Sequence, residues 1–305
     1  MSLVRVQQGA LSRTESGLSD DRKIIHTGPS PRGWHRLQLA AECLQKYAWN
    51  YGTGNPNGGK RLKVDSKRPA LAVGTLVHLA LAQHYAEMRD GPEGGWETPH
   101  RAVELISKLE GVEKHAERAL IAFDAYRLKY DWRDKEQWKV LAVEELLSTQ
   151  IAGKYLLTGR ADLVIEDPGG RVFVVDHKTT GRIQKSHKEF YPISGQLLGY
   201  SHMAREKYGE RFAGLIVNLI QTDGQRFERF TIPRSPHLES KFEQSVVDIE
   251  ESIERMKASG RAQDDWPKAM SELVCYHRYG ACDFIDKCRW GQEAKKGGAW
   301  SFALN

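Results

Sequence analysis

An acidic side chain and an amine stand together at the end of an apolar run in FVVDHKTT (residues 173–180). The apolar start of this segment suits a buried strand, and Asp176, His177 and Lys178 follow it with no loop residue between them. Because side chains alternate along a strand, Asp176 and Lys178 share one face. Buried charges are normally paired or bind a metal ion. The segment therefore predicts either an ion pair or a metal-dependent active site at a strand end.

A second carboxylate, Asp162, stands inside the preceding apolar run TGRADLVIED (158–167). If residues 168–170 form a three-residue hairpin loop, Asp162 lies opposite Asp176, whereas a two-residue loop puts the two acids on opposite faces. Facing carboxylates repel each other, and burial raises their pKa values. A divalent cation removes this conflict, because Mg²⁺ and Mn²⁺ bind hard oxygen ligands. The alternative is a salt bridge between Asp176 and Lys178, with Asp162 capping the turn.

Further polar residues occupy segments on both sides of this hairpin. GTLVHLALAQHY (74–85) and GQLLGY (195–200) lie in expected helices, and VLAVEE (140–145) ends an expected strand with two acids. Residues 196 and 200 are one helical turn apart and project together. The candidates in these segments are His78, Glu144, Glu145, Gln196 and Tyr200.

In this order, the motifs resemble the PD-(D/E)XK nuclease superfamily in its RecB-like, lambda-exonuclease-type branch. There an acid in one strand faces an acid-X-Lys triplet that ends its hairpin partner; here GRAD supplies Asp162, and DHK supplies Asp176 and Lys178. The resemblance implies that the two aspartates bind Mg²⁺ or Mn²⁺ together with the backbone carbonyl of His177. The metal would polarise the scissile phosphate and lower the pKa of a bound water. Lys178 would orient that water and offset the charge that develops on the phosphate.

The resemblance covers the chain from about Gln38 to Trp290 and implies an α+β, restriction-endonuclease-like fold. In that fold a central mixed β-sheet is flanked by helices, while an N-terminal helical part and a C-terminal cysteine-rich segment close on each other. Along the chain, we expect a flexible tail at 1–30, a helical N-terminal part at 31–135 with Cys43 and His78, a nuclease core at 136–235, a C-terminal helix and three-cysteine segment at 236–292, and a tail at 293–305.

The resemblance also implies roles for residues before the hairpin. His78 falls in a Gly-three residues-His helix motif and would be an additional metal ligand. A core or surface histidine with satisfied hydrogen bonds is the alternative. Glu144 is the closer match to the family's glutamate and would be catalytic. Glu145 is the runner-up, and a solvated strand edge is the alternative to both.

Residues after the triplet are candidates for holding the substrate. Gln196 and Tyr200 match the branch's Gln-three residues-Tyr motif on the following helix. Gln196 would bond a phosphate or a catalytic group, and Tyr200 would stack on a base or bond the DNA backbone; a helix with a buried tyrosine gives the same pattern. Thr179, Thr180 and Arg182 are candidate phosphate contacts, although ordinary loop residues would look the same.

The four cysteines are unevenly placed, with Cys43 far from Cys275, Cys282 and Cys288. This arrangement resembles the iron–sulfur subset of the branch, which includes CRISPR-adaptation nucleases, AddB-type helicase–nucleases and many phage exonucleases. The resemblance implies a [4Fe–4S] cluster held by the four thiolates. The trio here is separated by six and then five residues, whereas many members have a tighter first pair. Zinc also accepts four cysteines, and four unrelated reduced thiols are the third alternative.

The apolar periodicity predicts helices and strands around these motifs. Helices are expected at about 37–51, 71–88, 193–208 and 236–259, with one or two more between 101 and 129. Strands are expected at about 140–149, 155–166, 171–178, 212–221 and 226–232, with DPGG (167–170) as a hairpin turn.

The composition limits the class of protein. The 305 residues are 40% hydrophobic and 28% charged, which is ordinary for a soluble globular protein. No run of about 18 apolar residues predicts a membrane span, and the N-terminal residues lack the apolar core of a signal peptide. We therefore expect a cytoplasmic protein in a bacterial or phage-infected cell. The net charge of +5 permits a polyanionic partner without requiring one.

These observations together predict a metal-dependent deoxyribonuclease. We expect an exonuclease that acts on single-stranded DNA or duplex ends in recombination, repair or replication, with a recombination or helicase protein as a candidate partner. No G-x-x-x-x-G-K-[ST] phosphate loop is present, so the chain does not power its own translocation. The alternative is a non-catalytic DNA-binding or recombination-partner protein that retains the fold. The intact set of two acids and a lysine argues against it.

Overall fold

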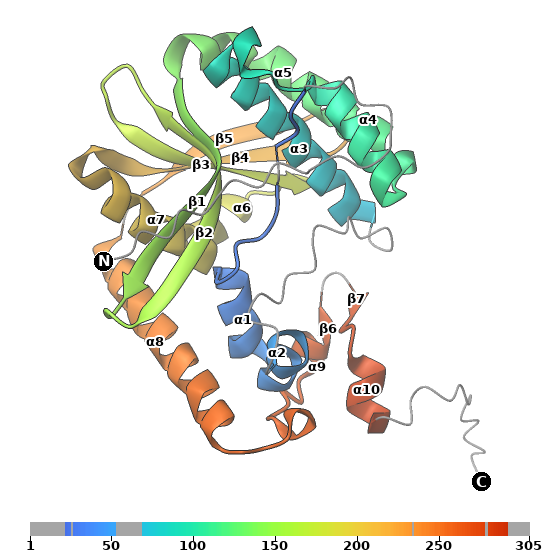
Figure 1. Cartoon of the computed structure of the whole chain (residues 1–305), viewed down its shortest axis with the longest axis vertical. Coiled ribbons are helices and arrows are strands. Elements are labelled where there is room, and N and C mark those ends of the chain that lie inside the picture. The colour runs from blue at the N-terminus through green and yellow to red at the C-terminus, as the bar shows by residue number, and fades with distance from the viewer. Residues whose placement is uncertain (1–21, 26, 53–68, 234, 278–279, 292–305) are drawn as a thin grey trace. The chain divides into compact units, whose positions relative to one another are not determined.

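The computed structural model describes residues 22–25, 27–52, 69–233, 235–277 and 280–291 (Figure 1). The chain divides into two compact units: one contains residues 1–34 and 59–245, and the other contains residues 35–58 and 246–305. Residues 1–21 of the expected N-terminal tail and the whole expected C-terminal tail (293–305) lie outside the described residues.

The described residues form helices and strands in an order that places the sheet in the middle of the chain. The helices are α1 (Trp34–Glu42), α2 (Leu44–Tyr51), α3 (Pro69–Asp90), α4 (Pro99–Glu110), α5 (Ala116–Gln137), α6 (His187–Phe190), α7 (Gly195–Tyr208), α8 (Pro236–Ala258), α9 (Glu272–Cys275) and α10 (Ile285–Trp290). The strands are β1 (Lys139–Ile151), β2 (Tyr155–Glu166), β3 (Val172–Thr180), β4 (Phe212–Gln221), β5 (Phe227–Ile232), β6 (Tyr276–His277) and β7 (Gly280–Ala281).

Five strands of the first unit form one mixed sheet in the order β1-β2-β3-β4-β5. The β1–β2, β2–β3 and β4–β5 pairs are antiparallel, and β3 and β4 are parallel. A parallel pair needs a crossover connection, and α6 and α7 supply it between β3 and β4. The sheet and its flanking helices confirm the expected α+β, restriction-endonuclease-like fold.

The β2–β3 hairpin has the three-residue loop that the sequence predicts. The backbone N–H of Asp167 donates to the carbonyl of Arg171 at 2.9 Å, so residues 168–170 form the loop. Gly170 has φ +76°, a left-handed conformation that a glycine adopts without steric penalty. Oδ1 of Asp167 also accepts hydrogen bonds from the N–H groups of Gly169 and Arg171, both at 3.0 Å. The turn is therefore capped by Asp167 and not by Asp162.

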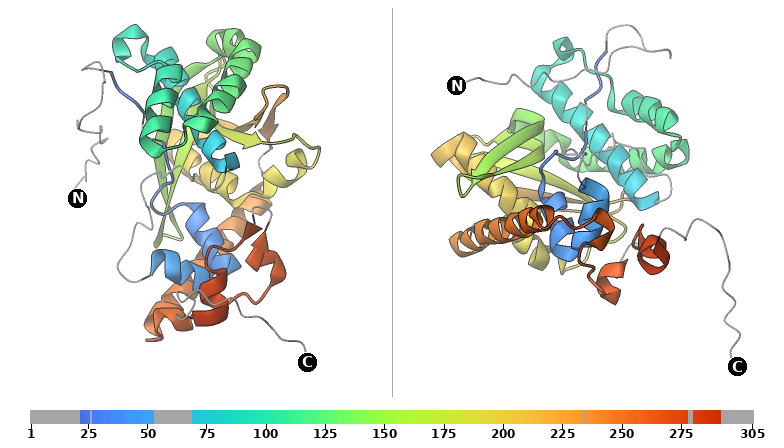
Figure 2. Two further views of the ribbon diagram at one scale, coloured as in Figure 1. Left: turned by 90° about the vertical axis from the view of Figure 1, so that its right-hand side faces the viewer. Right: turned by 60° about the horizontal axis from the view of Figure 1, so that its bottom comes forward.

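Helices cover both faces of this sheet, with α3, α4 and α5 on one face and α7 on the other (Figure 1, Figure 2). Leu163 and Ile165 of β2 pack with residues of α3, α4 and α5 in one apolar cluster. Val164, which points the other way, packs with Leu197 and Met203 of α7 in a second cluster. Strand alternation thus gives the sheet two buried faces, as burial by helices on both sides requires.

The described residues from Arg22 onward are bonded to the rest of the first unit instead of forming a free tail. Lys23 makes a parallel bridge with Trp96, and the N–H of Ile25 donates to Oε1 of Gln83 at 2.7 Å. Oγ of Ser30 donates to the carbonyl of Thr158 at 3.0 Å. The expected flexible tail at 1–30 is therefore wrong for the described residues from Arg22 onward, because their contacts lie far along the chain and leave no local pattern.

In the second unit, α1 and α2 contact the C-terminal segment. This agrees with the expectation that the N-terminal helical part and the cysteine-rich segment close on each other. The N–H of Gln45 donates to the carbonyl of Pro267 at 2.8 Å, and the ring of Tyr47 stacks on Trp266 with centroids 6.2 Å apart. The single helix expected at 37–51 is instead two helices, because Cys43 has extended backbone angles (φ −162°, ψ 110°) and caps α2.

The other expected elements agree with the structure to within a few residues, apart from α5, which extends to Gln137. The short elements α9, β6, β7 and α10 of the cysteine segment were not predicted, since they are too short to show a periodic pattern. Among the described helices, none combines the length and the apolar character needed to cross a bilayer.

Candidate active site

The β2–β3 hairpin brings Asp162 next to the acid-X-Lys triplet. Backbone pairing runs from Glu166 with Val172 to Leu163 with Val175, so the next position places Asp162 beside Asp176. Here Oδ2 of Asp162 accepts a 2.7 Å hydrogen bond from the backbone N–H of His177. A side-chain carboxylate thus serves as the acceptor at the point where the paired ladder ends.

His78 of α3, Glu144 of β1 and Asp162 of β2 meet at this point. One ligand-capable atom from each lies within 4.8 Å of the other two, and Nδ1 of His78 is 3.5 Å from Oδ2 of Asp162. The β1–β2 register places Glu144 opposite Asp162. Two carboxylates with an imidazole beside them form a donor set that suits a divalent cation such as Mg²⁺ or Mn²⁺.

The structure places Glu144, and not the adjacent Glu145, in this cluster. Glu144 has a φ of 50°, which is uncommon for a residue with a side chain, and its carbonyl accepts a 3.0 Å hydrogen bond from Nη1 of Arg160. Glu145 instead pairs with Lys207. Sequence reasoning missed Arg160, although its position two residues before Asp162 puts it on the same strand face.

Burial and neighbouring charges shift the pKa values of the two acids of the cluster in opposite directions. Burial raises the pKa of Glu144 well above its ordinary value, and the negative charge of Asp162 raises it further. Burial acts in the same direction on Asp162, but the charge and hydrogen bond of His78 outweigh it and lower the pKa of Asp162. A divalent cation fits this donor set, because it stabilises both carboxylates in their charged form.

Asp176 is fully buried (0% exposed) and directs its carboxylate at Lys178. Nζ of Lys178 lies 2.9 Å from Oδ1 and 2.8 Å from Oδ2, and it also donates to Oε1 of Gln196 at 2.9 Å. Burial raises the pKa of Asp176, while Lys178 opposes the shift. The salt bridge left open by the sequence is therefore present, and Asp176 lies outside the group of His78, Glu144 and Asp162.

Gln196 and Tyr200 continue this chain of contacts from α7 to β2. Nε2 of Gln196 donates to the hydroxyl of Tyr200 at 3.1 Å, and that hydroxyl donates to the carbonyl of Arg160 at 2.5 Å. Tyr200 is only 4% exposed, so its ring has no free face on which a base can stack. The expected DNA contact by Tyr200 would require this covered residue to become accessible, and it stays a prediction. The residue connects the helix to the strand that carries Asp162.

The residues directly after the triplet occupy different environments. Thr179 faces α3, where a Cβ at Gly74 would come within 2.7 Å of its Oγ1. Oγ1 of Thr180 donates to the carbonyl of Arg182 at 3.1 Å, closing a local turn. Arg182 itself is exposed.

The side chain of His177 lies in the core beside the cluster, with its ring edge-on to that of His78 and centroids 6.2 Å apart. It is 2% exposed, and its ring stacks on Tyr85 with centroids 5.7 Å apart and an interplanar angle of 12°. Burial lowers the pKa of His177 to about 3, so its ring is neutral near neutral pH. The sequence motif assigned a role to the backbone of this residue but did not predict the position of its ring.

The four cysteines lie together in the second unit as half-buried free thiols. Cys43 caps α2, and the N–H of Cys282 donates to the carbonyl of Cys275 at 2.8 Å. Burial raises the pKa of Cys288; Lys268 opposes this, and the other three cysteines add to it, as expected for neighbouring thiols. Among the described residues, no three of the sulfurs lie within 4.8 Å of one another, whereas four ligands about 2.3 Å from one zinc ion would.

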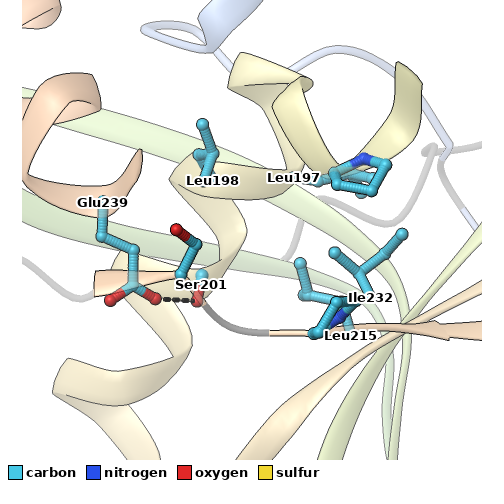
Figure 3. A pocket seen from close by; sticks show the side chains of 9 residues that line it. Leu197, Leu198, Ser201, Leu215, Ile232 and Glu239 are labelled. Atoms are coloured by element: carbon cyan, nitrogen blue, oxygen red, sulfur yellow. Dashed lines mark hydrogen bonds between the residues drawn. The ribbon is translucent and has the colours of Figure 1, made fainter. Parts of the chain in front are cut away.

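A pocket elsewhere in the first unit contains none of the predicted site residues (Figure 3). Leu197 and Leu198 of α7 and Ile232 of β5 form much of its apolar wall. Its polar contact joins Oγ of Ser201 to Oε1 of Glu239 at 2.9 Å. The pocket is therefore separate in its residues from the cluster at the hairpin.

Comparisons with known proteins point to one family. The family model described as "PD-(D/E)XK nuclease superfamily" matches residues 34–289. No curated protein matches the chain. Among solved structures, the crystal structure of SSO0001 is similar at 20% sequence identity and a TM-score of 0.29, covering 59% of this chain and 85% of that chain. At that TM-score the likeness supports no conclusion about this chain.

Proposed function

The chain belongs to the PD-(D/E)XK nuclease superfamily, whose match spans residues 34–289, and from this premise we propose a deoxyribonuclease centred on His78, Glu144, Asp162 and Lys178. The superfamily makes the chain a metal-dependent nuclease whose usual ions are Mg²⁺ and Mn²⁺. One observation carries the proposal: two carboxylates and an imidazole lie within 4.8 Å of one another where the β2–β3 ladder ends.

Asp162, Asp176, the backbone carbonyl of His177 and His78 are the proposed ligands, with Glu144 beside them. A bound ion would supply Lewis-acid polarisation of the phosphate and acidification of a water. This assignment is supported by the hydrogen bond that orients Asp162 and by the opposed pKa shifts of the two acids. Asp176 would join the ligand set by giving up part of its contact with Lys178.

Lys178 is the proposed electrostatic partner of the phosphate. Its ammonium group has three N–H donors, and Asp176 and Gln196 engage two of them. The third is available to a water or a phosphate oxygen, where it offsets developing negative charge. The hydroxyl of Tyr200 accepts a hydrogen bond from Gln196 and so fixes its amide. In this proposal the two residues of the Gln-three residues-Tyr motif therefore position Lys178.

The substrate is proposed to be single-stranded DNA or duplex ends, as in the RecB-like branch, and the reaction to be exonucleolytic. Exposed Arg182 beyond the triplet is a suitable phosphate contact, and Thr179 and Thr180 precede it. The net charge of +5 favours a sequence-independent grip on the DNA backbone. A role in recombination, repair or replication, with a helicase or recombination partner, follows from the same branch.

The cysteines are proposed to hold a [4Fe–4S] cluster, as in the iron–sulfur subset. Four thiols from both ends of the chain in one unit supply the usual ligand set. The cluster would tie α1 and α2 to the C-terminal segment.

A nuclease assay in Mg²⁺ or Mn²⁺, on protein prepared without oxygen, tests the proposal. Wild type should digest end-labelled linear DNA and leave circular single strands intact. Asp176→Ala and Lys178→Ala should lose about 100-fold or more in rate. Asp167→Asn is the matched control, because this acid lies in the same hairpin but is engaged by Arg171.

Two results would contradict separate parts of the proposal. Cleavage of circular DNA would rule out a strictly exonucleolytic reaction. Absence of cleavage by wild type on every DNA substrate would favour the non-catalytic DNA-binding alternative. Equal activity in wild type, Asp176→Ala and Lys178→Ala would place the reaction at another site.

A further inference from the structure

A buried polar network in the first unit links α3 and α5 to β4 and β5. Its members are Tyr85 of α3, Tyr126 and Asp134 of α5, Asn218 of β4 and Arg229 of β5. The guanidinium of Arg229 donates to both carboxylate oxygens of Asp134, at 2.6 and 3.0 Å. Its Nε donates to Oδ1 of Asn218 at 2.6 Å, and its Nη2 donates to the hydroxyl of Tyr126 at 2.9 Å. One arginine therefore joins α5, β4 and β5.

Arg229 is fixed in place by rings as well as by hydrogen bonds. Its guanidinium carbon lies 4.1 Å from the ring centroids of both Tyr130 and Trp138. Stacking of this kind suits the planar guanidinium and not the ammonium of lysine. The geometry thus depends on arginine itself and not merely on a positive charge.

The network reaches the active site through the ring of His177. Nδ2 of Asn218 lies 3.2 Å from Nδ1 of His177, and the ring of Tyr85 stacks on the ring of His177 with centroids 5.7 Å apart. The backbone N–H of the same histidine donates to Asp162. The side chain and the backbone of His177 therefore connect the network to a proposed metal ligand.

A second connection runs along α3. Tyr85 stands two helical turns after His78, on the same side of the helix, and its hydroxyl donates to Oδ2 of Asp134 at 2.7 Å. The hydroxyls of Tyr85 and Tyr126 are also 2.8 Å apart. These bonds join the helix that carries His78 to α5, and Arg229 joins α5 to the sheet.

We propose that Arg229, Asn218 and the ring of His177 are positioning residues that set the distance between His78 and Asp162 and so determine divalent-cation affinity. The inference rests on the proposed function, since it requires that the cluster bind a cation. Outer-shell partners of this kind change metal affinity by about 10- to 100-fold. A buried ion pair is weak evidence for stability, since apolar residues of similar volume often stabilise as well. A role in geometry accounts for the network better than a role in stability.

Calorimetric titration of the full chain with Mn²⁺ alone tests the proposal. We expect Arg229→Lys and His177→Phe to weaken Mn²⁺ binding by about 10-fold or more. Arg229→Lys keeps the charge but loses the planar fork. His177→Phe keeps the aromatic stack and the backbone N–H but removes the acceptor for Asn218, and it provides the test if Arg229→Lys does not fold.

Arg36 provides the matched control, because it is a buried arginine that pairs with Glu250 and donates to the Tyr47 hydroxyl at 3.1 Å. Arg36→Lys should lower the thermal midpoint yet leave Mn²⁺ affinity unchanged. Equal affinity in wild type, Arg229→Lys and His177→Phe would overturn the positioning role, as would an equal loss in Arg36→Lys. Absence of Mn²⁺ binding by wild type itself would instead overturn the proposed function.

Discussion

The backbone N–H of His177 donates a 2.7 Å hydrogen bond to Oδ2 of Asp162, directly beyond the last backbone pair of the β2–β3 ladder. The bond fixes one carboxylate oxygen of Asp162 while β2 and β3 lose their regular pairing. The same oxygen lies 3.5 Å from Nδ1 of His78. The end of the hairpin is therefore the place where strand pairing gives way to a cluster of ligand-capable groups.

Gly74 permits the close approach of α3 to β3, and its replacement should disturb the position of His78 one turn later. A Cβ there would lie 2.7 Å from Oγ1 of Thr179 but 3.9 Å from its Cβ. We expect Gly74→Ala to destabilise the fold by about 1–3 kcal/mol through overpacking and to weaken Mn²⁺ binding. Adding Thr179→Ala should restore both properties, because it removes the clashing oxygen. Denaturant unfolding measures the stability of the two single variants and the double variant, and calorimetry measures their Mn²⁺ affinity. If the effects of the two substitutions simply add, the prediction is contradicted.

The raised pKa of Glu144 predicts a pH dependence of stability in the metal-free protein. Because the pKa is raised above its ordinary value of 4.5, the folded state retains a proton that the unfolded state has lost. The free energy of unfolding should therefore fall as the pH rises above about 4.5, with a contribution of up to about 1.4 kcal/mol per pH unit. Glu144→Gln should remove this contribution, and so should saturating Mn²⁺.

Glu145→Gln is the control for that experiment, since Glu145 pairs with Lys207 outside the cluster. Urea unfolding at a series of pH values from about 5 to about 8 measures how the free energy of unfolding of each variant changes with pH. The same slope in wild type and Glu144→Gln would show that Glu144 does not carry a raised pKa.

His84 should make the protein less stable in acid. Burial lowers its pKa from 6.5 to about 4, so between these values the unfolded state binds a proton that the folded state does not. Stability should fall as the pH drops through this window, and buried His177 acts in the same direction. His84→Phe retains ring packing against Phe123 and should reduce the acid loss. An acid profile of His84→Phe equal to that of wild type would contradict the assignment.

Cys43 tests whether both ends of the chain contribute to one iron–sulfur group. Wild type purified without oxygen should be brown from thiolate-to-iron absorption and contain iron and sulfide. Cys43→Ala should lose this colour although more than two hundred residues separate it from the trio, since all four cysteines lie in one unit. Colourless wild type with one zinc per chain would identify the rival metal, and undiminished colour in Cys43→Ala would exclude this cysteine as a ligand.

The hairpin register was predictable because few choices were open. DPGG offers a loop in which Gly170 takes the left-handed position, and strand alternation then fixes which side chains face each other. The choice of Glu144 over Glu145 had no such basis in periodicity. It depends on a φ of 50° at Glu144 and on the bond from Arg160, which only the folded chain shows.

Other features were out of reach for a similar reason. The helix break at Cys43 comes from one extended residue within a continuous apolar pattern. The burial of Tyr200 and the docking of Ile25 on Gln83 depend on partners 40 and 58 residues away. Local patterns carry no information about such partners, so the sequence could suggest candidate site residues but not the network of contacts around them.

The location of a bound cation tests the central claim most directly. Crystals soaked in Mn²⁺ should give an anomalous peak within about 2.2 Å of a carboxylate oxygen of Asp162, next to His78 and Glu144 and within reach of Asp176. Asp162→Asn should abolish that peak, whereas Asp167→Asn should retain it. A saturating soak that places no Mn²⁺ at Asp162, or places it only elsewhere, would contradict the account.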